Sequence, residues 1–248
     1  MSGEAMIISR RAVFAGAGAL IFSFSSLGRV HAQGGGGQAT ASAPTQLPSS
    51  LKKAPFLDSW IRIDADGTIT IFTGKAELGQ GIKTALLQIA TEQLDVAFDQ
   101  LTLVTADTAR TPDEEYTAGS HSVQDSGTAI MEAAAQVRQL LIAEAATRSG
   151  VTADQLRTEG AAVIAPDGRR FAYRDLVADQ MLHVEAAPQS PLKDPHQFKI
   201  IQQPVPRVDI PAKVTGGEAY VQDLRPRRHG AWPRRSAAEL WGEASQRR

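Results

Sequence analysis

The fold of this chain is decided by the stretch ITIFTGKAELGQGIKTALLQIA, residues 69–90. Its first five residues are β-branched or aromatic, which favours a strand, and residues 82–90 repeat apolar side chains at helical spacing. Gly79 and Gly81 flank Gln80 between the two. Glycine lets a ligand approach the backbone closely, the first turn of a helix offers free N–H groups, and a glutamine amide both donates and accepts. The motif therefore indicates either a ligand-facing loop or a plain strand-to-helix turn.

A second polar loop, residues 107–127, precedes a helix predicted over residues 128–149. Around Gly119 it carries three hydroxyl side chains, Thr117, Ser120 and Ser122. Hydroxyls and exposed amides on a short loop suit a phosphate or a pterin-like ring, but the same residue types also cap helices. Because both loops precede helices of one small unit, we expect them to open on the same edge of a sheet.

The remaining elements predict an α+β fold, in which two main helices pack on one face of a mostly antiparallel sheet. Residues 60–73 form a predicted β-hairpin with Asp66-Gly67 at its turn, and residues 101–105 a third strand. Gly150 is expected to end the long helix. A short helix over 152–158, a hairpin around 166–168 and a short helix over 173–179 complete the domain, which spans residues 56–185. A proline-rich, extended connector follows at 186–207.

The N-terminal residues 1–32 have the pattern of a twin-arginine export signal. Arg10 and Arg11 precede a short apolar run, residues 15–22, and small residues at 30–32 offer a cleavage point. An uncleaved membrane anchor is the alternative, but the run is short and rich in glycine. We therefore expect a periplasmic protein with no membrane span after cleavage, and a flexible linker over residues 33–55.

Composition excludes several classes of function. The chain has 26 basic and 27 acidic residues and no basic stripe before its last two dozen positions, so no nucleic-acid partner is expected. Without cysteine it cannot form disulfides, thiolate metal sites or its own iron–sulfur clusters. The histidines lack metal-ligand spacing, and no Ser/His/Asp arrangement stands out. We interpret the acidic run 113–115 as a solvated face, and we predict neither a metal ligand nor a catalytic residue.

Taken together, the ordered motifs resemble a known family. E-x-GQG-x-x-T-x-L-x-Q-I-A-x-E-x-L begins at Glu77, and V-x-A-D-T-x-x-T-P, T-x-GS-x-S and G-x-A follow in that order. This order resembles the molybdopterin-binding large subunit of the xanthine dehydrogenase and aldehyde oxidase family. It looks closest to the branch typified by the β chain of isoquinoline 1-oxidoreductase. Residues 208–225 resemble the start of the family's next domain, so that the resemblance covers about 57–225.

The resemblance implies a molybdenum hydroxylase that oxidises small aldehydes or N-heterocycles. In that family a molybdopterin-type molybdenum cofactor does the chemistry, and a small partner subunit with two 2Fe-2S clusters removes the electrons. Carried over by motif, the first loop would face the pterin with Gly79, Gln80 and Gly81. The second loop would face the polar rim of the pterin with Thr117, Gly119, Ser120 and Ser122.

The chain departs from this family in length. Family large subunits are several times longer, and their catalytic base lies near the far end, so we expect the N-terminal part of such a subunit with no turnover of its own. After Leu224 the resemblance stops and arginines crowd residues 226–248. A truncated or frameshifted gene explains this tail, and a basic tail that contacts an acidic partner is the competing hypothesis. In a second hypothesis, the chain is a periplasmic, non-catalytic binding module that kept the fold.

Overall fold

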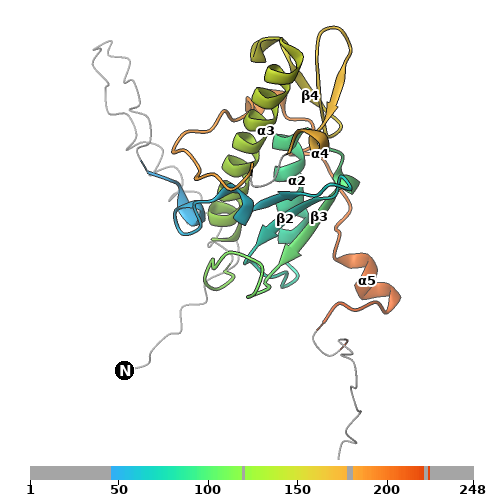
Figure 1. The fold of residues 1–248 in the computed structure, drawn as a ribbon. Coiled ribbons are helices and arrows are strands. Elements are labelled where there is room, and N and C mark those ends of the chain that lie inside the picture. The colour runs from blue at the N-terminus through green and yellow to red at the C-terminus, as the bar shows by residue number, and fades with distance from the viewer. Residues whose placement is uncertain (1–45, 119–120, 178–180, 221–222, 224–248) are drawn as a thin grey trace, which may run out of the picture. The chain divides into compact units, whose positions relative to one another are not determined.

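The first sheet begins with the predicted hairpin. The structure, a computed structural model, describes residues 46–118, 121–177, 181–220 and 223 (Figure 1). Strands β1 (Ile61–Ile63) and β2 (Ile69–Thr73) pair antiparallel, with Ile61 opposite Ile71 and Ile63 opposite Ile69. The turn between them contains Gly67 at a φ of 92°, a left-handed conformation that glycine adopts without strain. This confirms the hairpin.

Strand β3 (Leu101–Thr105) joins the same sheet parallel to β2, and α2 (Ile82–Leu94) connects the two strands. The register places Thr73 opposite Thr105, and the N–H of Ala106 donates to the Thr73 carbonyl at 2.9 Å. Parallel strands end at the same edge of a sheet. The loops that follow β2 and β3 therefore start side by side, as expected, and the parallel pair is the reason.

The long helix α3 (Thr128–Ser149) has the bounds that its periodicity predicts, and a short π-helix, Ser122–Gly127, leads into it. Gly150 takes a φ of 71° and its N–H donates to the Ala146 carbonyl, which confirms it as the C-cap. The helix packs closely on α2, since a Cβ added to Gly127 would lie 3.1 Å from Ile89 Cδ1. Alanines supply much of its buried face: Ala129, Ala133, Ala134, Ala135 and Ala145.

A second sheet consists of β4 (Arg157–Glu159), β5 (Ala162–Ile164) and β6 (Arg170–Ala172), all paired antiparallel. The β5–β6 pair confirms the hairpin around 166–168. The helix predicted over 152–158 is wrong, because only Ala153–Gln155 make a 3₁₀ turn and β4 follows. Pairing of Thr158 with the buried Val163 overrides the local helical spacing. The α+β class is confirmed, with the described strands divided between two sheets; α4 (Tyr173–Leu176) follows β6.

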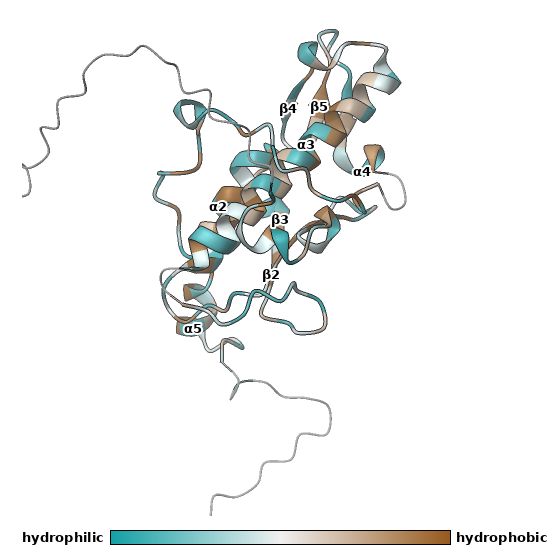
Figure 2. Cartoon of the chain, turned by 90° about the vertical axis from the view of Figure 1, so that its left-hand side faces the viewer, coloured by the Kyte–Doolittle hydropathy of each residue, from teal (hydrophilic) through white to brown (hydrophobic). Residues whose placement is uncertain are grey.

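The hydrophobic core extends to residues before the predicted start of the domain. Ser49–Lys52 form a 3₁₀ turn whose Leu51 is fully buried, and the Trp60 indole N–H donates to the Ala54 carbonyl at 2.9 Å. The ordered part therefore begins before Phe56. Hydrophobic and hydrophilic residues lie next to each other along α2 (Figure 2), as expected for a helix with one buried side.

Residues 186–209, here called the strap, run along α2 and lead to α5 (Ile210–Thr215; Figure 1). Lys193 contacts Asp95 just after the helix, and the Val208 N–H donates to Thr84 Oγ1 near its start. Buried Glu92 holds the strap, because its Oε2 accepts hydrogen bonds from the N–H groups of residues 199–201. Within the described ranges, no helix is both long and apolar enough to cross a bilayer. The predicted export signal, the linker up to residue 45, and the tail 226–248 lie outside the described residues.

Candidate cofactor-facing site

The two loops at the shared edge are joined directly. Thr117 Oγ1 accepts a hydrogen bond from the Ala76 N–H at 2.8 Å. Closer to the sheet, a Cβ added to Gly74 would lie 2.4 Å from the Pro112 carbonyl oxygen, so that only glycine fits there. The sequence predicted a common edge for these loops, and the structure adds contact between them.

A buried polar cluster lies beneath this junction. Glu114 Oε2 accepts hydrogen bonds from Thr73 Oγ1 at 2.7 Å, from the Gly74 N–H at 2.8 Å and from Ser126 Oγ at 3.2 Å. Lys75 is 1% exposed, and its Nζ donates to the Glu114 carbonyl at 2.7 Å. The cluster fixes the end of β2, the second loop and the π-helix to one another. The solvated face predicted for 113–115 is thus wrong at Glu114, which the loop folds inward to meet the end of β2.

Glu77 occupies the N-terminal end of α2. Its Oε1 accepts from the N–H groups of Gly79 and Gly81 at 2.8 and 2.9 Å, and its Oε2 accepts from the Lys83 N–H at 3.2 Å. Burial would raise the pKa of this carboxyl group, but these hydrogen bonds outweigh burial and lower it below the ordinary value. Of the N–H groups at this helix start, those of Gly79, Gly81 and Lys83 are therefore taken by the chain's own carboxylate.

The open face of the first loop lies at Gly79 and Gln80, which are both exposed. Gly79 has a φ of 102°, and a Cβ added there would meet no atom within 4 Å. The Gln80 side chain folds back on its own loop, donating to the Ala76 carbonyl at 3.0 Å and accepting from the Leu78 N–H at 2.6 Å. Gly81, in contrast, is covered, because an added Cβ would lie 3.7 Å from Arg207 Cζ.

The end of the strap closes over this loop. Arg207 Nη1 donates to the Gly79 carbonyl at 2.9 Å, and the same guanidinium forms two hydrogen bonds with Asp209. Hydrogen bonds from Arg207 and then from Lys213 hold the pKa of Asp209 well below its usual range. A cavity of about 710 Å³ remains beside the loop, between Gly79 and Tyr220.

The second loop contributes less to the exposed edge than the sequence suggested. Thr117 is half-buried, and its hydroxyl accepts the hydrogen bond from the Ala76 N–H that joins the two loops. Ser122 is 3% exposed and its Oγ donates to the Ala118 carbonyl at 2.9 Å, so this hydroxyl would have to turn to reach a ligand. Gly119 and Ser120 lie outside the described residues. In the described ranges, no cluster of three or more acidic or histidine side chains could hold a metal ion.

Comparison with known proteins identifies the family of this fold and its two joined loops. The family model described as "Molybdopterin cofactor-binding domain" matches residues 28–208. The chain belongs to this family. The match takes in both loops and nearly all of the strap.

Named relatives agree with this assignment to the molybdopterin cofactor-binding family. The B chain of nicotinate dehydrogenase from Pseudomonas putida is 37% identical over 67% of this chain and 14% of its own length. The beta chain of isoquinoline 1-oxidoreductase from Brevundimonas diminuta is 29% identical over 90% of this chain and 32% of its own length. Among solved structures, the reconstituted CO dehydrogenase of Oligotropha carboxidovorans aligns with a TM-score of 0.42 and 24% identity, covering 47% of this chain and 15% of that one. The chain thus spans a third or less of the relatives' lengths.

The exposed loop fits the family's cofactor in part. No side chain blocks close approach to Gly79, and the Gln80 amide lies at the surface with a donor and an acceptor. The polar atoms of Gly79 and Gln80, like those of Gly81 and Ser122, are engaged with the chain's own atoms, so these hydrogen bonds would have to be exchanged for bonds to a cofactor. Sequence reasoning missed Glu77 and Arg207 as the residues that shape the loop. The family motif itself includes Glu77, whereas Arg207 stands 128 positions after Gly79 and gave no local signal.

Proposed function

We propose that this chain forms one edge of the cofactor site in a molybdenum hydroxylase large subunit. The observation that carries the proposal is the joined pair of loops at the carboxyl ends of β2 and β3, with Gly79 and Gln80 exposed at the tip. Ligands of sheets with parallel strands bind at the carboxyl ends of those strands. Membership in the molybdopterin cofactor-binding family names the ligand.

In this proposal, the chain's own residues bind and orient the cofactor. Gly79 offers backbone without a side chain in the way, and the Gln80 amide matches a polar heterocycle once it leaves the Ala76 carbonyl. Glu77 and Thr117 hold the loop in shape from behind. When bound, the molybdenum cofactor supplies the redox chemistry, and the protein supplies position. We expect no turnover by these 248 residues alone, because they supply a minor part of the relatives' length.

The substrate and partners follow from the same family. We propose a small aldehyde or N-heterocycle as the substrate, in line with relatives named for nicotinate and isoquinoline. The electrons would leave through a small partner subunit with two 2Fe-2S clusters, as the resemblance to molybdenum hydroxylases implies, and these 248 residues contain no cysteine that could hold such clusters. We expect no nucleic-acid partner, since positive and negative charges nearly balance.

Isolation of the tagged chain from its native cells tests the cofactor and the partner together. We expect it to co-purify with molybdenum, with a pterin and with a chain that shows a 2Fe-2S spectrum. A chain that folds and binds a partner without metal or pterin would instead support a non-catalytic binding module. In the first loop, Glu77 accepts hydrogen bonds from the backbone N–H groups and Arg207 donates to the Gly79 carbonyl. This closed state of the loop favours the non-catalytic binding module.

We further propose export to the periplasm by the twin-arginine route, on the basis of Arg10 and Arg11. Replacing both by lysine should leave the protein in the cytoplasm, as fractionation with immunoblotting would detect. Equal periplasmic amounts of the double variant and the wild type would reject this route.

A further inference from the structure

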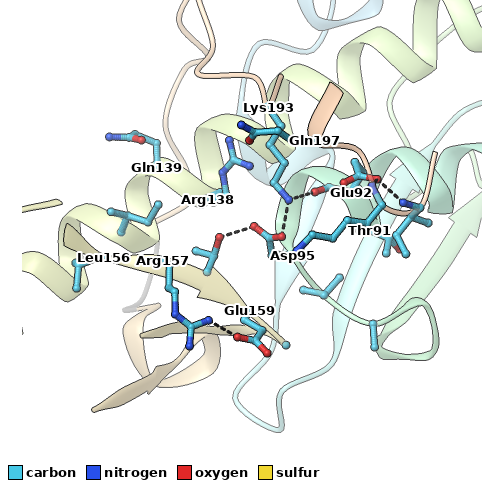
Figure 3. Close-up of a pocket in the computed structure, with 17 residues that line it drawn as sticks. Thr91, Glu92, Asp95, Arg138, Gln139, Leu156, Arg157, Glu159, Lys193 and Gln197 are labelled. Atoms are coloured by element: carbon cyan, nitrogen blue, oxygen red, sulfur yellow. Dashed lines mark hydrogen bonds and ion pairs between the residues drawn. The ribbon is translucent and has the colours of Figure 1, made fainter. Parts of the chain in front are cut away.

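A second cavity lies away from the predicted cofactor residues. It has a volume of about 730 Å³ and is formed by the C-terminal part of α2, by α3, by β4 and by residues 193–200 of the strap (Figure 3). None of the seven predicted cofactor residues lines it. Four cationic side chains do, namely Arg138, Arg157, Lys193 and Lys199.

Three carboxylates line the same cavity, and each is already engaged. Glu92 is 2% exposed, and its Oε2 accepts from the N–H groups of residues 199, 200 and 201 at 2.9, 2.6 and 3.1 Å. Asp95 pairs with Lys193 and accepts from Thr158. Glu159 pairs with Arg157. The acidic groups of the cavity are therefore satisfied by the chain itself.

Arg138 differs from Arg157, the other arginine of the cavity, because no carboxylate of the described residues lies within ion-pair distance of Arg138. The side chain belongs to a residue 8% exposed, and its Nη2 donates to the Pro191 carbonyl at 2.6 Å. Figure 3 shows no interaction between Arg138 and the carboxylates drawn. Burial lowers the pKa of Arg138, and the charge of Asp95 opposes this effect only through space. A guanidinium has five N–H donors, so one carbonyl leaves most of its capacity unused.

Two further groups in the lining of this cavity lack side-chain partners in the described part of the chain. The Lys199 ammonium forms no ion pair there, although its backbone N–H is bound to Glu92. The Thr91 hydroxyl is buried, lines the cavity and has no hydrogen-bond partner. A buried polar group without a partner is costly, and it indicates a missing ligand or solvent.

We propose that this cavity binds a small oxyanion, a phosphate or carboxylate group, held by Arg138, with Lys199 and Thr91 as further donors in the same lining. Guanidinium groups bind such anions through paired, charge-assisted hydrogen bonds. The anion also neutralises the surplus positive charge, because the four cations outnumber the three carboxylates. The site is independent of the proposed cofactor function, since it shares no residue with the loop edge.

Isothermal titration calorimetry on the full chain tests this site, with inorganic phosphate and acetate as separate probes at constant ionic strength. We expect saturable binding at one site for at least one probe, and the probe that binds identifies the oxyanion. Arg138→Gln should weaken the affinity about tenfold, which is the usual effect of losing a hydrogen bond to a charged group. Arg62→Gln is the matched control, because Arg62 is an exposed arginine of β1 that pairs with Asp64. The affinity of this variant for the anion should stay within about twofold of wild type.

A second variant guards against misfolding of Arg138→Gln. Glu159→Gln removes an exposed carboxylate and frees Arg157, so it should tighten binding about threefold. Absence of saturable heat with both probes would overturn the proposal. An equal loss of affinity in Arg62→Gln and Arg138→Gln would do the same, because it would show a general charge effect.

Discussion

Thr117 and Ala76 stand 41 residues apart, and a hydrogen bond of 2.8 Å from the Ala76 N–H to Thr117 Oγ1 holds two loops together as one edge. Strands β2 and β3 bring the loops to the same end of the sheet, and this contact sets their distance. The exposed tip at Gly79 and Gln80 is therefore supported from behind by the second loop.

Replacing Thr117 with valine tests this support. The variant keeps the shape of the side chain but leaves the partly buried Ala76 N–H without an acceptor, so the free energy of unfolding in urea should fall by about 1–2 kcal/mol. Thr147→Val is the control, since that hydroxyl donates to the Ala143 carbonyl on the exposed side of α3, and we expect a change below about 0.5 kcal/mol. Equal effects of the two variants would mean that the junction adds nothing.

Glu77→Gln should destabilise the chain in a pH-dependent way. The pKa of Glu77 is lowered on folding, so its stabilising effect is complete above the ordinary value of 4.5 and disappears as the pH falls through the lower folded value. At pH 7 the loss should be about 1–2 kcal/mol, as for a lost helix cap. Urea unfolding at pH 7 and at pH 3 should show the gap to wild type closing in acid. A gap of constant size would contradict the charged cap.

Glu92→Gln should loosen the strap without loosening the sheet. Charge-assisted hydrogen bonds from three N–H groups to one carboxylate oxygen are replaced by weaker ones to an amide. Hydrogen exchange at residues 199–201 should become about tenfold faster, while residues 101–105 stay protected. Glu144→Gln, on the exposed side of α3, should change neither region. Unaltered exchange at 199–201 would show that other contacts hold the strap.

Much of the fold followed from sequence periodicity. Helix α3 has its predicted bounds because apolar spacing, a long run without breakers and Gly150 all agree. The helix expected over 152–158 failed because β4 is stabilised by Val163 of the neighbouring strand, which local spacing does not reveal. Periodicity also left the parallel pairing of β2 with β3 unpredicted, since strand direction depends on the path of α2 between them.

The candidate site was predictable in its location more than in its bonding. Two glycines around Gln80 marked the exposed loop, and motif order supplied the family. Glu77 as the cap and Arg207 as the cover depend on folding of the loop and on the strap's return over a long sequence distance. The buried partners Lys75 and Glu114 were missed because charged residues are expected at the surface unless their partners are known.

The central claim, that the Gly79 tip contacts the molybdopterin cofactor, is tested most directly by the pterin content of Gly79→Ala isolated from native cells. Gly168→Ala is a matched control, because both glycines have positive φ and no atom within 4 Å of an added Cβ, so backbone strain is similar. Pterin per chain can be measured by fluorescence after oxidation, and molybdenum by mass spectrometry. We predict that pterin and molybdenum fall several-fold in Gly79→Ala and remain at the wild-type level in Gly168→Ala. Equal cofactor content in the two variants would contradict the claim.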